Sequence, residues 1–298
     1  MIRGRLRIAS LGLLLALVPL AYAQAGEVRD MLGRRVVVPE RPARVVSLAP
    51  NLTEIVFALG AGEQLVGVTD YCDFPAEASK KAKVGGICTP NFEAILSLRP
   101  DLILATTEGN REEHILGLER LRIPIYVVRP IDFLTVLESI DRVGKLLGRD
   151  PEPLAGGMRR QAEAIARAVE SRRRPRVLYV LWGNPLIVPG RDTLITDLIR
   201  RAGGESVSAN EALAYPRLSV EETVARRPEV VVIALHGEGS IDQRLREWEH
   251  LGLLSAVRQG RVHEIHGDLT HRPGPRIVDG LRRLARMFHP DVAFALDR

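Results

Sequence analysis

From residue 44 onward, the hydrophobic positions of the chain alternate between two periods. Short runs rich in Val, Ile and Leu, typical of buried strands, are separated by stretches whose apolar residues recur every three or four positions, as on one face of a helix. This alternation is the pattern of parallel sheets covered by helices. In the first half it predicts strands at 45–48, 65–69, 102–105 and 125–128 and helices around 54–59, 92–98 and 111–121. Asn51, three residues before Glu54, is expected to cap the first helix.

A second series starts at residue 176. It predicts strands at 177–180, 230–234 and 262–265 and a closing helix at 277–288. Between the two series, residues 133–171 show two helical patterns that meet near 148–153. The second helical pattern places Leu154, Met158, Ile165 and Val169 on one face. Its position midway through the alternation favours a strut lying across two lobes, and an ordinary surface helix is the alternative.

The pattern therefore predicts an α/β protein with two lobes, each built on a central, mostly parallel sheet, joined by a single long helix. A length of 298 residues also suits two domains. The expected segments are a signal peptide at 1–25, an N-terminal lobe at 26–130, a helical segment at 131–174 and a C-terminal lobe at 175–298.

The first 25 residues have the pattern of a cleaved secretory signal. Three arginines precede an apolar run at 8–20, and small residues follow at Ala21, Ala23 and Ala25. The alternative, a membrane anchor, would need a longer apolar run. Because neither cysteine lies near this segment for lipid attachment, we expect a mature protein that is free in the periplasm.

Composition narrows the possible partners. The chain is 46% apolar and 27% charged, which is typical of a globular protein. Its formal charge of +5 falls to +2 once the three arginines of the signal segment are left out. A nearly balanced surface does not favour nucleic acid or a membrane as a partner.

The two cysteines, Cys72 and Cys88, would lie in an oxidising compartment. A disulfide between them is possible at a separation of sixteen residues. Two buried thiols are the alternative.

One segment of the first half recurs in the second. The sequence EAILSLRPDLI at 93–103 returns as EETVARRPEVV at 221–231. In both copies a helix, a proline stop and a strand follow one another, and Glu93 or Glu221 stands in the first helical turn. The repeat suggests two lobes of similar build, each with a carboxylate at the same place. Without another role, these carboxylates would only complement the helix dipole.

The sequence contains no nucleophile elbow, phosphate-cradling loop or zinc-protease motif, so it does not favour an enzyme. His266, Asp268 and His271 share one loop, which His114 and His236 could join, but nothing in the spacing fixes a metal site. Hydrogen-bonding or solvated histidines are favoured. We expect no metal and no cofactor.

Candidate ligand-binding residues lie on the loops that follow strand ends, where open α/β sheets bind ligands. In the first half these are Pro50, Asn51, Tyr71, Gly86, Ile87 and Thr106. In the second half they are Trp182, Tyr215, Arg217, Asp268, His271 and Arg272. The second set mixes aromatic, acidic and basic groups, as a large and partly polar organic ligand requires.

Several segments resemble one known family. They are RVVSLAPNLTE at 44–54, VGVTDYCDFP at 66–75, VGG at 84–86, NFE at 91–93 and LRPDL at 98–102. Together they resemble the substrate-binding proteins of ABC importers for vitamin B12 and iron chelates. The resemblance covers about residues 43–290 and implies a ligand cleft between the two lobes.

The resemblance also implies roles for individual residues. Glu93 and Glu221 match the two acidic residues that dock onto arginine pockets of the membrane permease dimer. Ligand-contacting positions of the cobalamin receptors are matched by Pro50, Tyr71, Tyr215, Asp268 and Arg272. Where those receptors carry aromatic residues, this chain has Ile87, Thr106 and Ile187, which leaves fewer rings to stack on a corrin.

The function expected from these features is that of a monomeric periplasmic receptor that delivers a corrinoid to an ABC permease without chemical change. A ferric siderophore or haem is the alternative ligand, which Arg217, Arg272 and Tyr or His groups would hold. A protein that binds only other proteins is the remaining alternative.

Overall fold

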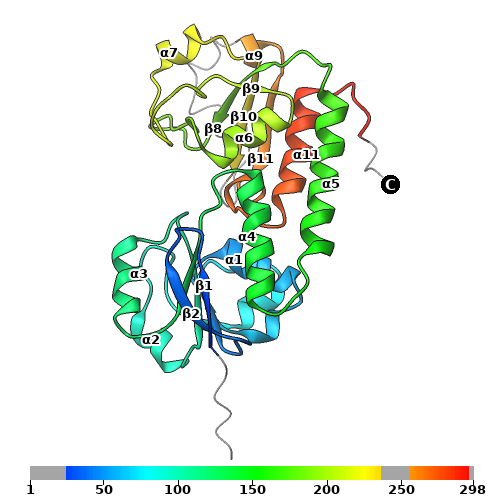
Figure 1. Ribbon diagram of the computed structural model, residues 1–298. Helices are drawn as coiled ribbons and strands as arrows, with labels where there is room; N and C mark the ends of the chain where they lie inside the picture. The colour runs from blue at the N-terminus through cyan, green and yellow to red at the C-terminus, as the bar shows by residue number, and fades with distance from the viewer. Residues whose placement is uncertain (1–24, 236–254, 295–298) are drawn as a thin grey trace, which may run out of the picture.

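The computed structural model describes residues 25–235 and 255–294, which form two α/β lobes, one above the other in Figure 1. The N-terminal lobe contains a parallel sheet of five strands in the order β5-β4-β3-β6-β7. In chain order these strands are β3 (Val45–Ser47), β4 (Leu65–Val68), β5 (Ala82–Lys83), β6 (Leu102–Thr106) and β7 (Ile125–Val128). The C-terminal lobe contains a parallel sheet in the order β11-β10-β8-β9. Its strands are β8 (Arg176–Val180), β9 (Glu205–Ser206), β10 (Val230–Leu235) and β11 (Val262–His266).

The two sheets share one topological feature. The first strand of each, β3 or β8, has neighbours on both sides, because the chain goes first to one side and then to the other. The loop after such a strand lies at a topological switch point, where open α/β sheets bind ligands. The fold thus places residues 48–50 and 181–184 at equivalent positions of the two lobes.

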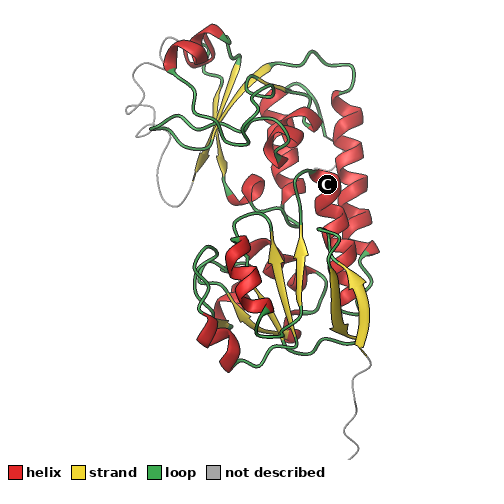
Figure 2. Ribbon diagram, turned by 60° about the vertical axis from the view of Figure 1, so that its left-hand side comes forward, coloured by secondary structure: helices red, strands yellow, loops and turns green. Residues whose placement is uncertain are grey.

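Helices cover both sheets, and the long helices run along one side of the molecule (Figure 2). In the N-terminal lobe they are α1 (Pro50–Ala58), α2 (Phe92–Ser97) and α3 (Glu112–Glu119). The linking helices are α4 (Phe133–Leu146) and α5 (Glu152–Val169). In the C-terminal lobe they are α6 (Leu194–Arg201), α7 (Val220–Ala225), α9 (Ser255–Arg258), α10 (Asp268–His271) and α11 (Ile277–Phe288).

All seven predicted strands and the closing helix are present, and the two-lobe α/β fold is confirmed. An N-terminal hairpin of β1 (Ala25–Arg29) and β2 (Arg35–Pro39) was not predicted. It buries Val36 and Val38, and the backbone N–H of Met31 donates to the carbonyl of Val127 beside the sheet.

Helix α5 is the predicted strut. It is about 27 Å long and packs against α4, α6 and α11, and it lies on one side of the molecule, next to α11 (Figure 1). Met158, Ile165 and Val169 of the predicted apolar face are buried, and Leu154 is half-buried. Small residues complete this face, because Ala155 and Ala162 are also buried. The small side chains allow the neighbouring helices to approach closely.

One apolar core is shared by the two lobes. A single cluster of buried side chains runs from Leu52 and Leu104 in the N-terminal lobe through Val136 and Met158 to Leu281 in the C-terminal lobe. Smaller clusters lie on the opposite face of each sheet. The lobes are therefore parts of one packed body, and moving one lobe against the other would disturb close-packed side chains.

The segment predicted to be a secretory signal lies outside the described residues, apart from Ala25, which begins β1. No helix in the described parts of the chain has the length and apolarity needed to cross a membrane.

The expected cap of the first helix is wrong, because α1 starts at Pro50 after Ala49, without any side-chain cap.

Candidate functional site

A cavity of about 180 Å³ lies between the two lobes. The N-terminal lobe contributes Glu108, and the segment between β7 and α4 contributes Pro130. The C-terminal side contributes Leu181, Leu194, Ile195, Tyr215, Thr270, His271 and Pro273. Because its walls come from both lobes and both are held by the shared core, the cavity is largely formed before any ligand binds.

Polar groups stand at defined places in the cavity wall. The hydroxyl of the buried Tyr179 lies 2.7 Å from Thr270 Oγ1 and 3.0 Å from His271 Nε2, which fixes the imidazole. Burial raises the pKa of Glu108, although the charge of Arg129 opposes the shift. Partial burial, and then the charge of Glu108, raise the pKa of Tyr215, so the Tyr215 phenol stays protonated at neutral pH.

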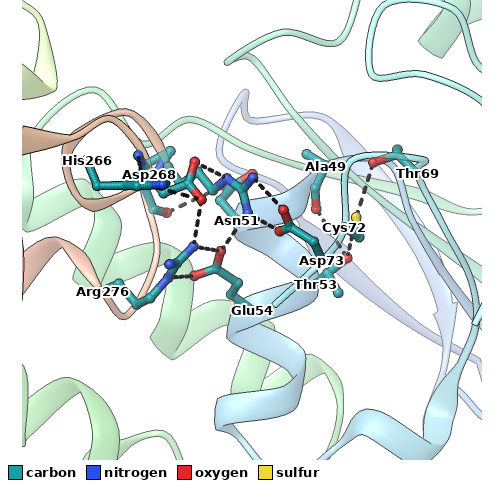
Figure 3. Close-up of polar contacts among 12 residues, drawn as sticks. Ala49, Asn51, Thr53, Glu54, Thr69, Cys72, Asp73, His266, Asp268 and Arg276 are labelled. Atoms are coloured by element: carbon teal, nitrogen blue, oxygen red, sulfur yellow. Dashed lines mark hydrogen bonds and ion pairs between the residues drawn. The ribbon is translucent and has the colours of Figure 1, made fainter. Parts of the chain in front are cut away.

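An ion cluster crosses between the lobes next to this cavity (Figure 3). Its centre is the carboxylate of Glu54 on α1, whose side chain is only 2% exposed. Arg276, at the start of α11, donates to it through Nε at 2.8 Å and Nη2 at 2.6 Å. Arg272 Nη1 lies 3.3 Å from the same carboxylate. Such a two-point contact fixes both distance and orientation between the lobes.

Two further carboxylates complete the cluster. Asp73, on the loop after β4, accepts from Arg272 Nη1 at 2.6 Å. Asp268 forms an ion pair with Arg272 Nε at 2.9 Å and accepts a hydrogen bond from Arg276 Nη2 at 3.4 Å. The ring of Phe74 lies 4.3 Å from Arg276 Cζ, a cation–π contact. The cluster thus combines two guanidinium groups with three carboxylates.

The predicted ligand residues fall into separate groups. Tyr215 and His271 line the cavity, and Asp268 and Arg272 belong to the ion cluster. Asn51 is buried beside the cluster, where its Nδ2 lies 3.4 Å from the carbonyl of Pro273.

A second group lies on the C-terminal lobe. Ile187 pairs through its backbone with both Trp182 and Arg217, which brings these three predicted residues together. Trp182 is 53% exposed, and its indole N–H donates to the carbonyl of Asn184. Arg217 is also exposed.

The remaining predicted residues belong to the N-terminal lobe. The ring of Tyr71, which is 61% exposed, lies close to Gly86. Ile87 lies against Gly109, whose missing side chain leaves room for it. Pro50 and Thr106 are buried, and the Thr106 hydroxyl accepts from the N–H of Glu108. Thr106 therefore shapes the loop that carries Glu108, and its contact with a ligand stays a prediction.

Four residues of the site were not predicted: Glu54, Asp73, Phe74 and Arg276. Two of them, Asp73 and Phe74, lie in the same loop as Tyr71, where an acid next to an aromatic residue was a usable signal. Glu54 matched a helix-capping pattern, which concealed its contact with the other lobe.

The possible disulfide is not formed, because both cysteines are free, and the alternative of two buried thiols holds for Cys72 but not for Cys88. Cys72 is buried, and its Sγ lies 3.1 Å from the hydroxyls of both Thr53 and Thr69 (Figure 3). Cys88 is exposed on another loop, where its thiol donates to the carbonyl of Gly109 at 3.2 Å. The two thiols are thus held by different neighbours, one in the core and one at the surface.

The described residues contain no group of three His, Cys, Asp or Glu side chains placed to hold a metal ion. Instead, His266 accepts from the backbone N–H of Asp268 through Nδ1 and so helps to form its loop. His236, the further candidate, lies outside the described residues.

The two predicted docking glutamates occupy equivalent places in the two lobes. Glu93 and Glu221 are exposed in the first turns of α2 and α7, whose caps are Asn91 and Ser219. Asn91 Oδ1 accepts from Ala94 N–H, and Ser219 Oγ accepts from Glu222 N–H. Both helices lie on the side of the molecule away from α5 (Figure 1).

The internal repeat extends to the contacts that hold these helices. In the N-terminal lobe, Arg44 donates to the carbonyl of Leu98, and Asp101 accepts from the N–H of Arg44. In the C-terminal lobe, Arg176 donates to the carbonyl of Arg227, and Glu229 accepts from the N–H of Arg176. Each helix end is thereby tied to the first strand of its own sheet.

Two α/β lobes on a helical spine, with a cavity lined from both lobes, define a receptor that encloses a small molecule between two halves. Residues 45–269 match the model of the periplasmic binding protein family, and the chain belongs to that family. A vitamin B12-binding protein of Vibrio parahaemolyticus is 29% identical over 248 residues, which cover 82% of this chain and 89% of that protein.

Solved structures of periplasmic binding proteins also have folds similar to that of this chain. The periplasmic vitamin B12 binding protein of Vibrio cholerae has a TM-score of 0.73 at 28% identity, covering 85% of this chain and 98% of that one. A periplasmic heme binding protein of Pseudomonas aeruginosa also has a TM-score of 0.73, at 30% identity, covering 85% of this chain and 94% of that one. The fold is therefore shared by receptors of different ligands.

The first prediction concerns Glu54. We expect Glu54→Gln to lower the free energy of unfolding in urea by about 3 kcal/mol, because it leaves buried guanidinium groups short of a charged partner. Glu77→Gln, a change at an exposed acid of the same lobe, is the control and should alter it by less than about 0.5 kcal/mol. Equal stability of the two variants would show that the inter-lobe cluster does not stabilise the fold.

The second prediction concerns the thiols. In the native protein one thiol per chain, that of Cys88, should react with Ellman's reagent, and Cys72 should react only after unfolding in urea. Cys88→Ser should remove the native signal, whereas Cys72→Ser should retain it. A wild-type protein without any reactive thiol before or after unfolding would instead contain the disulfide.

Proposed function

We propose that the protein captures a corrinoid in the inter-lobe cavity and delivers it unchanged to an ABC permease dimer in the inner membrane. In this proposal residues 1–25 direct export and are removed, and the mature receptor acts as a monomer in the periplasm. The protein brings no cofactor of its own and catalyses no reaction.

The charge balance of the ion cluster is the observation that carries the corrinoid assignment. Arg272 and Arg276 are both engaged by carboxylates, and the cluster has one more carboxylate than guanidinium groups. A corrin ring carries neutral carboxamide side chains, which require hydrogen bonds and not a free cation. A ring with carboxylate side chains would meet excess negative charge here.

Exposed aromatic rings support the same class of ligand. Tyr71, Trp182 and Tyr215 are each more than half exposed, on loops that follow strands of the two lobes. Large exposed aromatic side chains on a monomer indicate a surface that a partner covers. Because the cavity of about 180 Å³ is small for a corrinoid, these rings would extend the contact beyond it.

Haem is the second candidate ligand. His271 and Tyr215 both line the cavity, and imidazole and phenolate are groups that ligate haem iron in proteins. The structural similarity to a heme binding protein supports this alternative. The two ligands differ in their side chains, because haem carries two propionates.

Docking onto the permease is assigned to Glu93 and Glu221. Both carboxylates are exposed, they lie one in each lobe, and the structure gives each the same local support. Two equivalent contacts suit a permease of two equivalent subunits. Because α5 and the shared core oppose large lobe movements, delivery would need only a small opening of the lobes.

The third prediction tests the ligand. Cyanocobalamin should bind the wild-type protein in calorimetry, and Tyr215→Ala should weaken this binding by about tenfold or more, because it removes a ring from the cavity wall. Leu213→Ala removes an exposed apolar side chain from the same loop outside the cavity and is the control. Unchanged affinity of Tyr215→Ala would exclude this cavity as the corrinoid site.

The fourth prediction tests docking. The double variant Glu93→Ala with Glu221→Ala should lose binding to permease-containing vesicles, since it removes both exposed docking charges, while its cobalamin affinity stays within twofold of wild type. The control, Glu112→Ala with Glu205→Ala, removes one exposed acid from each lobe at other sites. Normal vesicle binding by the first variant would refute the docking role.

A further inference from the structure

The three carboxylates of the ion cluster differ in their access to solvent. The side chain of Glu54 is 2% exposed and that of Asp268 is 23% exposed, whereas that of Asp73 is 65% exposed. Glu54 and Asp268 each contact both arginines, but Asp73 pairs with Arg272 alone. Asp73 is thus the member of the cluster that a ligand group could replace without opening the core.

The ion pair between Asp73 and Arg272 lies beside the cavity proposed to hold the ligand. Arg272 stands between His271 and Pro273, which both line the cavity. Asp73 follows Tyr71 by two residues on the opposite lobe. The ion pair between Asp73 and Arg272 therefore crosses from one lobe to the other at the edge of the site.

We propose that Asp73 determines the ligand specificity of this receptor: it occupies the Arg272 guanidinium and thereby excludes ring ligands that carry carboxylates in favour of those that carry carboxamides. This inference rests on the proposed function, because it requires that a tetrapyrrole-like ring binds in the inter-lobe cavity. It adds the residue that separates the two candidate ligand classes.

Two physical effects produce the exclusion. A ligand carboxylate would have to displace Asp73 from Arg272, which exchanges one charge-assisted hydrogen bond for another without a net gain. The displaced Asp73 and the ligand would then leave the cluster with additional negative charge. A carboxamide group avoids both costs, since it can accept or donate hydrogen bonds without replacing a charged partner.

The exclusion persists at neutral pH. The hydrogen bond from Arg272, more than any other interaction, holds the pKa of Asp73 below its usual value, so Asp73 stays ionised. The buried Glu54 could not act in this way, because its guanidinium contacts also hold the two lobes together. Specificity and lobe attachment thus fall to different carboxylates of one cluster.

The test compares three ligands with wild type and Asp73→Asn: haem, haem dimethyl ester and cyanocobalamin. Asparagine keeps the size of the side chain but removes its charge. We expect haem to bind Asp73→Asn about tenfold more tightly than wild type, as expected for one newly available charge-assisted contact. The ester, which has no free carboxylate, should change by less than twofold, and so should cyanocobalamin.

Two control variants separate the proposed mechanism from general effects. Asp70→Asn removes an exposed negative charge from the same loop, three residues away, and should leave all three affinities unchanged. Adding Arg272→Gln to Asp73→Asn should abolish the gain for haem, with melting temperatures confirming that the variants are folded. An equal gain for haem and its ester, an equal gain in Asp70→Asn, or no gain for haem would each overturn the role of Asp73.

The same measurements keep this inference apart from the proposed function. If wild type does not bind cyanocobalamin but Asp73→Asn still gains affinity for haem alone, the corrinoid assignment fails and the specificity role stands. If cyanocobalamin binds and haem gains nothing in Asp73→Asn, the function stands and the role of Asp73 fails. If no ring binds to either protein, both are refuted.

Discussion

The packing of α5 against α4, α6 and α11, within a core shared by both lobes, is the constraint on which the rest of the structure depends. Met158, Ile165 and Val169 on α5 belong to the same buried cluster as residues of both sheets, so neither lobe has a separate core on this side. A cavity between two bodies keeps its shape only if the bodies cannot slide. Here the apolar cluster prevents sliding, and the ligand need not supply the energy to assemble its own site.

The inter-lobe ion cluster fixes the relative orientation of the two lobes. Burial of apolar surface is not directional, whereas the two hydrogen bonds from Arg276 to Glu54 require one relative orientation of α1 and α11. The core thus sets how closely the lobes approach, and the ion pair sets their angle. Asp73, at the solvent-exposed end of the cluster, contributes least to the distance and the angle between the lobes, so it can take part in ligand selection.

The fold was predictable because its strands are continuous apolar runs and α5 has a clear helical period. Strands of two residues, such as β5 and β9, carry no periodic signal, and the hairpin around Gly33 precedes the region where alternation begins. The site was less predictable. Loop residues such as Tyr215 and His271 were found from their position after strands, whereas Glu54 showed only its local capping pattern.

The cysteines illustrate the same limit. Their separation along the chain permits a disulfide, but the direction of each side chain depends on tertiary packing, and Cys72 turns toward Thr53 on α1. Arg276 was missed for a similar reason, because its partner comes from 222 positions away in the chain. Contacts between distant segments decide the chemistry of this site, and a local sequence pattern does not record them.

The equivalent hydrogen bonds of Arg44 and Arg176 to the ends of α2 and α7 affect how these helices move. Each joins a short surface helix to the first strand of the sheet in its own lobe, so the helix moves together with that lobe. The distance between Glu93 and Glu221 therefore changes with the angle between the two lobes. A rotation too small to alter the cavity visibly would still displace these two outlying carboxylates, because they lie far from the pivot at α5.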